Sequence, residues 1–114
     1  MTDLTNTHCV PCEGGTEPLK SEEIAKLKSQ IPNWTVAQDE RSISREFKFE
    51  NFVDSVVFIT DVAHVAEEEG HHPDLYLHDY KFVTVTLSTH AIHGLSENDF
   101  IVAAKIDMVH NDAR

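Results

Sequence analysis

Two pairs of short strands, each pair joined by a tight polar turn, constrain the fold of this 114-residue chain most strongly. In segment 43–49 apolar and polar residues alternate with period two, which indicates a strand with one buried face. A strand over 34–37 precedes it across the turn 38–41, and segments 75–80 and 83–87 form a second pair. Strands joined by short turns run antiparallel, so we expect a largely antiparallel sheet.

Three predicted helices alternate with these strand pairs. The first begins at Ser21 and stops at Pro32, and the others are capped by Asn51 and Ser96, polar residues favoured at helix starts. The second helix carries apolar residues every three or four positions, which predicts a buried stripe made of Phe52, Val56, Ile59, Ala63 and Ala66. This order predicts an α+β domain: a four-stranded antiparallel sheet with three helices packed on one face.

The length allows one domain, which we expect over residues 19–110. Residues 1–18 are polar and rich in glycine and proline, which predicts an extended or loosely packed N-terminal arm. Residues 111–114 form a polar tail.

The formal charge of −11 argues against a nucleic-acid partner, because phosphate binding needs clustered Lys and Arg. No apolar run approaches the roughly 18–20 residues of a membrane span. The N-terminus lacks the basic start and apolar stretch of a signal peptide. We therefore expect a cytoplasmic protein with neither a nucleic-acid nor a membrane partner.

Cys9 and Cys12 form a Cys-x-x-Cys pair in the arm, a spacing found in redox motifs and in half of a zinc site. A zinc site needs two further ligands, and no second Cys or His pair follows at zinc-finger spacing. A thioredoxin-like pair belongs between a strand and a helix, whereas this one lies in a polar tail. The sequence favours neither a metal nor a redox role.

Candidate catalytic side chains lie at the ends of the predicted helices and strands. His71 and His72 close the second helix, because the residue before Pro73 is disfavoured in the helical conformation. His90 follows the last strand, and Asp99 lies in the first turn of the last helix. Histidine gains and loses a proton near neutral pH, so this group predicts acid–base chemistry.

A metal site is the competing interpretation, because His, Asp and Glu are also metal ligands. Glu67 lies four residues before His71, so we expect the two on one helix face. Successive helix residues diverge by about 100° and successive strand residues face opposite sides, so His71 and His72 are poorly placed to share one ion. We expect no metal.

The pattern His71-His72-Pro73, then Ser88-Thr89-His90, then Ser96-Glu97-x-Asp99 resembles the pterin-4a-carbinolamine dehydratases. The likeness spans roughly residues 20–108 and includes Trp34 and the Phe47-x-Phe49-x-x-Phe52 stretch. The resemblance implies an enzyme, a hydro-lyase without a cofactor, that dehydrates 4a-hydroxytetrahydropterin (4a-hydroxytetrahydrobiopterin) to quinonoid dihydropterin. This reaction recycles the pterin of aromatic amino acid hydroxylases. It also implies a homodimer or homotetramer.

Carried over by position, the resemblance makes His71 and His72 the acid–base pair, while His90 orients the pterin. The expected catalytic group is His71, His72, His90 and Asp99. The expected substrate-binding group is Glu67, Pro73, Ser88, Thr89 and Trp34. A non-catalytic pterin-binding or regulatory dimerisation module is the alternative, and pterin turnover separates the two.

Overall fold

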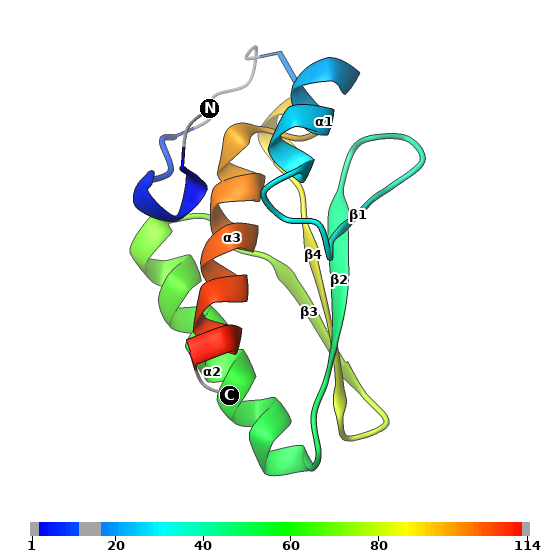
Figure 1. The fold of residues 1–114 in the computed structure, drawn as a ribbon, viewed down its shortest axis with the longest axis vertical. Coiled ribbons are helices and arrows are strands. Elements are labelled where there is room, and N and C mark those ends of the chain that lie inside the picture. Colours follow the sequence, from blue (N-terminus) through cyan, green and yellow to red (C-terminus); the bar gives the residue numbers. More distant parts are fainter. Residues whose placement is uncertain (1–2, 12–16, 113–114) are drawn as a thin grey trace.

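The computed structural model describes residues 3–11 and 17–112. Within these ranges the chain forms an α+β domain with the predicted alternation of helices and strand pairs (Figure 1). In chain order its elements are η1 (Leu4–Asn6), α1 (Ser21–Lys28), β1 (Thr35–Val36), β2 (Ile43–Lys48), α2 (Phe52–Glu69), β3 (Asp74–His78), β4 (Phe82–Leu87), η2 (His90–Ile92) and α3 (Glu97–Asp112).

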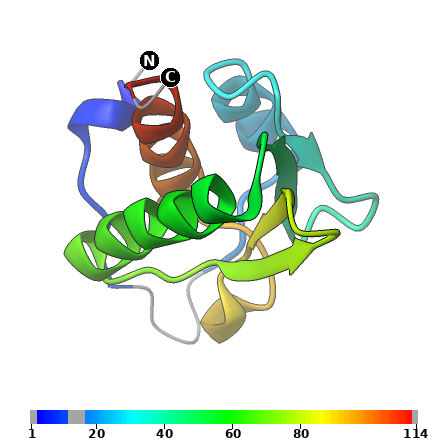
Figure 2. The same cartoon turned by 90° about the horizontal axis from the view of Figure 1, so that it is seen from below.

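The four strands form one antiparallel sheet in the order β1-β2-β4-β3, which confirms both predicted hairpins. Strands β2 and β4 make its centre, paired from Ile43↔Leu87 to Lys48↔Phe82. On β4 the side chains of Val83, Val85 and Leu87 are fully buried, and the threonines between them are partly exposed. The three helices cover one face of the sheet, as predicted (Figure 2).

Helix α2 begins and ends through specific backbone contacts. The side chain of Asn51 accepts a hydrogen bond from the N–H of Asp54 at 2.8 Å, which confirms the predicted cap. At the other end Gly70 takes a left-handed conformation with φ of 65°, which glycine adopts at little cost. The N–H of His71 then donates to Ala66 O at 3.2 Å. The helix therefore stops immediately before the paired histidines.

The predicted buried stripe of α2 is wrong in part. Phe58, Val62 and Ala66 face the core, and Phe52, Val56 and Ala63 are exposed. This helix is apolar on two sides, so periodicity alone did not identify the side that faces the sheet. The second side leaves a stripe of apolar residues on the surface: Phe52, Val53, Val56 and Val57.

The described part of the N-terminal arm is packed rather than loose. Leu4 is fully buried in the core, and its N–H donates to Gln30 Oε1 at 3.2 Å. Cys9 also packs against the core. The composition of the arm concealed this docking, because a single large apolar residue anchors the segment. In Figure 1 η1 lies beside α3 and the C-terminal end of α2.

Helix α3 is buried on almost all sides, because η1, α1, α2 and the sheet surround it (Figures 1 and 2). Every residue from Asn98 to Ile106 is buried. This explains why its apolar residues follow no clean helical period. Within the described part of the chain, no helix combines the length and apolarity needed to cross a membrane.

Candidate active site

The centre of the site is a hydrogen bond between His71 and Asp99. His71 follows the end of α2, and Asp99 lies in the first turn of α3. His71 Nε2 is 2.6 Å from Asp99 Oδ1, and the two side chains are 13% and 0% exposed. The fold thus brings together two of the predicted catalytic residues, and one side of the imidazole remains at the surface.

Neighbouring groups hold the Asp99 carboxylate in place. Its Oδ2 accepts hydrogen bonds from Thr89 Oγ1 at 2.8 Å and from the Ser96 N–H at 3.0 Å. The Thr89 and Ser96 hydroxyls lie 2.8 Å apart. A carboxylate only accepts, so His71 Nε2 carries the hydrogen, and Nδ1 of the neutral ring holds the free lone pair. Asp99, predicted as catalytic, is itself fully buried, so any role that it has in the reaction is exerted through His71.

The third histidine lines a neighbouring hollow. A loop from Thr89 to Gly94 is closed by the hydrogen bond from Thr89 N–H to Gly94 O at 2.8 Å. Within it, η2 presents His90 at the surface. The hollow has a volume of about 190 Å³, and its walls are Arg41, Ser88, Thr89, His90, His93 and Gly94. Thr89 lines this hollow and also hydrogen-bonds Asp99, so it connects the hollow to the His71–Asp99 pair.

The polar groups of Thr89, which was predicted to bind substrate, all have partners inside the protein. Its hydroxyl bonds Asp99, its N–H bonds Gly94, and its carbonyl accepts from the N–H of Ile92 at 3.2 Å. The residue is also 5% exposed. It therefore links the loop to the aspartate, while the half-buried Ser88 remains a candidate contact.

Glu67, which was expected to share a helix face with His71, contacts His72. Glu67 Oε2 is 2.5 Å from His72 Nε2, and the side chains are 76% and 60% exposed. The prediction assumed that the helix continued to His71, whereas it ends at Glu69 and the chain turns at Gly70. An exposed pair of this kind contributes little to stability.

Trp34, predicted to bind substrate, lies in the core, apart from the His71–Asp99 pair. It is 1% exposed, and its Nε1–H donates to Asp107 Oδ1 at 2.9 Å. Asp107 lies eight residues beyond Asp99 on α3, roughly 12 Å further along the helix axis. Its large apolar ring is part of the core, where it packs edge-on against Phe47.

Sequence reasoning overlooked Arg41, Glu69 and Lys105. Arg41 was hidden in a polar turn, although it lines the hollow beside His90. Glu69 and Lys105 form a buried ion pair with an N–O distance of 2.5 Å. A signal existed for Glu69, because it lies seven residues after Val62 and three after Ala66, on the buried face.

Cys9 is the described member of the cysteine pair, since Cys12 lies outside the described residues. Burial, together with the nearby Glu69 carboxylate, raises the pKa of the Cys9 thiol to about 12. The thiol therefore stays protonated at neutral pH. Across residues 3–11 and 17–112, no group of three or more His, Cys, Asp or Glu is arranged to hold a metal ion.

Fold and site together define a small α+β protein that presents histidines, oriented by carboxylates, at the ends of its helices and strands. The chain belongs to the pterin 4 alpha carbinolamine dehydratase family, whose family model matches residues 17–109. A Halorhodospira halophila relative is 47% identical over 91% of this chain and 94% of its own length. A Rubrobacter xylanophilus relative is 44% identical over 94% and 98%. Both are provisionally named pterin-4-alpha-carbinolamine dehydratases.

Solved structures show the same fold. A transcriptional coactivator/pterin dehydratase from Brucella melitensis matches with a TM-score of 0.75 and 30% identity, over 82% of this chain and 98% of its own. A pterin dehydratase-like protein, described as a RuBisCO assembly factor in the alpha-carboxysome, matches with a TM-score of 0.57. It is 22% identical over 68% of this chain and 88% of its own, so it shows likeness of fold alone.

Proposed function

We propose that this protein is a hydro-lyase that converts 4a-hydroxytetrahydropterin to quinonoid dihydropterin and water. The reaction recycles the pterin cofactor of aromatic amino acid hydroxylases. The observation that carries the proposal is the surface imidazole of His71, held by the buried carboxylate of Asp99. Membership of the family supports a pterin as the substrate class.

The reaction requires two proton transfers and no redox step. One proton is delivered to the departing 4a-oxygen, which leaves as water, and one is removed from the nitrogen side of the ring. His71 and His72 supply this acid–base pair, so the enzyme ends each turnover with the protons it began with. Each positioned acid or base typically contributes ~10²–10⁴-fold to the rate. Asp99 and Glu67 hydrogen-bond the two rings and orient them.

The hollow beside Thr89 provides the binding half of the site. His90, His93 and Arg41 present donors there, and Ser88 adds a small polar group. His90 orients the pterin ring at this position. Pro73, partly buried directly after the histidine pair, limits the backbone conformations of His72.

A dehydratase assay on 4a-hydroxytetrahydropterin generated in situ tests the proposal. The expected result is acceleration of quinonoid dihydropterin formation above the uncatalysed rate. Equilibrium binding of a stable pterin is measured in parallel. Binding without acceleration would overturn the enzymatic proposal and favour the alternative, a non-catalytic pterin-binding or regulatory dimerisation module.

We further propose that the protein forms a homodimer or homotetramer. The surface stripe of α2 places Phe52, Val53, Val56 and Val57 in solvent, and β3 is an edge strand with Leu75 and Tyr76 exposed. A second copy that covers these residues removes apolar area and a strand edge from water. Light scattering should give a mass above that of the 12.9 kDa monomer, and Val53→Asp with Val57→Asp should lower it. A wild-type monomer at micromolar concentration contradicts this proposal.

A further inference from the structure

The N-terminal arm binds two helices through two consecutive residues. The N–H of Cys9 donates to Glu69 Oε1 on α2 at 2.8 Å. The N–H of Val10 donates to Asn98 Oδ1 at 3.1 Å, and Asn98 Nδ2 donates to Val10 O at 2.5 Å. Successive amides of extended chain point in opposite directions, which suits a segment lying between two helices.

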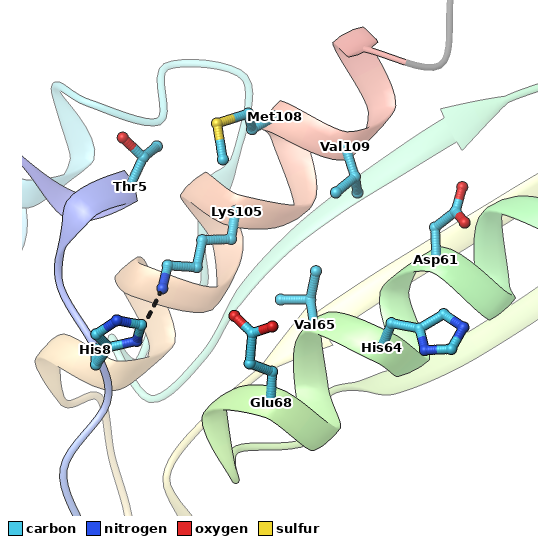
Figure 3. A pocket seen from close by; sticks show the side chains of 9 residues that line it. All are labelled: Thr5, His8, Asp61, His64, Val65, Glu68, Lys105, Met108 and Val109. Atoms are coloured by element: carbon cyan, nitrogen blue, oxygen red, sulfur yellow. Dashed lines mark hydrogen bonds between the residues drawn. The ribbon is translucent and has the colours of Figure 1, made fainter.

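A third contact joins the two helices directly. Lys105 Nζ on α3 donates to Glu69 Oε2 at 2.5 Å, and His8 Nδ1 lies 3.1 Å from the same oxygen. The side chains of Glu69 and Lys105 are 1% and 9% exposed. Figure 3 shows His8 and Lys105 facing each other from the arm and α3, at one wall of a groove of about 620 Å³.

The contacts of this cluster favour the ionised form of Glu69. Burial alone raises the pKa of a carboxyl group. Here the hydrogen bonds from Lys105, the Cys9 N–H and His8 outweigh burial and lower the pKa of Glu69 to about 2. Glu69 is thus a charged acceptor for the arm and for α3 at neutral pH.

These contacts flank the two partners of the central hydrogen bond. Glu69 precedes His71 with only Gly70 between them, and Asn98 immediately precedes Asp99. We propose that Glu69, Lys105 and Asn98, linked through the arm, are positioning residues that fix the His71 ring against Asp99. A displacement of about 1 Å in a catalytic group can cost ~10²-fold in rate. These hydrogen bonds and the ion pair therefore affect the rate, although none of the three residues touches substrate. Their effect on catalysis rests on the proposed dehydratase function.

Two variants remove different contacts of this cluster. Asn98→Ala deletes both bonds to Val10 and leaves the buried ion pair intact. Glu69→Gln with Lys105→Met removes the charges together, because removing one partner leaves an unpaired buried charge and endangers folding. Arg45→Met is the matched control, since it breaks the Arg45–Asp107 ion pair (2.7 Å) further along α3. We expect kcat to fall ~10-fold in both test variants with KM nearly unchanged, and kcat to be retained in Arg45→Met.

A measurement independent of turnover completes the test. Nitrogen-15 NMR of the histidine rings reports whether the His71 Nε2 hydrogen is held by Asp99. We expect its exchange with water to accelerate in both test variants and to stay slow in Arg45→Met. If folded Asn98→Ala keeps both kcat and slow exchange, the proposal is wrong, and a fall in kcat with slow exchange also contradicts it. If the wild type shows no dehydratase activity but the exchange changes as expected, the positioning stands and the proposed function fails.

Discussion

Helix α3 carries two aspartates that hold an aromatic ring nitrogen, with very different consequences. Asp99 holds His71 Nε2 at 2.6 Å, and Asp107 holds Trp34 Nε1 at 2.9 Å. The indole has a single nitrogen, a donor only, so this hydrogen bond uses all of its polar capacity. The imidazole keeps a second nitrogen, and its side chain is 13% exposed. A buried carboxylate therefore supports chemistry only when the ring it holds retains a free, accessible group.

The remaining partners of the two aspartates widen this difference. Asp107 also accepts from the guanidinium of Arg45 at 2.7 Å, so its charge is already balanced. The further donors to Asp99 are the hydroxyl of Thr89 and the N–H of Ser96, both neutral. His71 therefore meets Asp99 without competition from an arginine, whereas Asp107 is shared between an arginine and the indole of Trp34.

The largest expected effect is that of His71→Ala. We expect kcat to fall by ~10²-fold or more, because one acid–base group is lost, while the fold persists. Steady-state kinetics after subtraction of the uncatalysed rate, with circular dichroism as the folding check, measure this. Full kcat in folded protein would show that His71 transfers no proton.

Asp99→Asn should have a smaller effect of the same kind. The asparagine oxygen can still accept from Ser96 N–H, but its NH₂ then faces His71 Nε2 and moves the ring hydrogen to Nδ1. We expect kcat to fall ~10-fold or more from loss of the required tautomer. Asp107→Asn is the control on the same helix, and equal losses of kcat in the two variants would contradict the comparison.

Trp34→Phe should alter stability and leave kinetics alone. It deletes the donor to Asp107 but keeps most of the buried ring, so we expect a loss of about 1–3 kcal/mol in the free energy of unfolding. Urea denaturation measures the loss, and kcat and KM should match the wild type. A selective rise in KM would show that Trp34 contributes to substrate binding.

The smallest expected effect is a change in how stability depends on pH. The folded state lowers the pKa of Glu69, so it binds that proton less tightly than the unfolded chain, and stability falls as the pH drops from about 4.5 towards about 2. Burial raises the pKa of Asp107, despite the opposing hydrogen bonds from Trp34 and Arg45, so its protonation favours the folded state on acidification.

Thermal unfolding measured at several acid pH values tests these opposite signs. The double variant Glu69→Gln with Lys105→Met should make the loss of stability on acidification shallower, and Asp107→Asn should make it steeper. Parallel curves for the two variants would show that these carboxylates titrate alike in the folded protein.

Much of the fold was predictable, because period-two strands and short turns are local properties of the sequence. The partners of the site residues were less accessible. The family pattern grouped His71 with Asp99, but whether Glu67 reaches His71 or His72 depends on the left-handed turn at Gly70. Likewise Trp34 and Thr89 share the family pattern, yet their polar groups are already engaged inside the protein. These hydrogen-bond partners depend on contacts between distant segments, which local sequence patterns do not specify.

The burial of α3 on nearly every side has a consequence for motion. Its amide hydrogens between Asn98 and Ile106 are shielded, so we expect them to exchange with water mainly through opening of the whole domain. Asp99 therefore lies on an element that we expect to open slowly, whereas His71 lies in a short connection after a helix end. We then expect fluctuations of their hydrogen bond to come mainly from movement of the histidine.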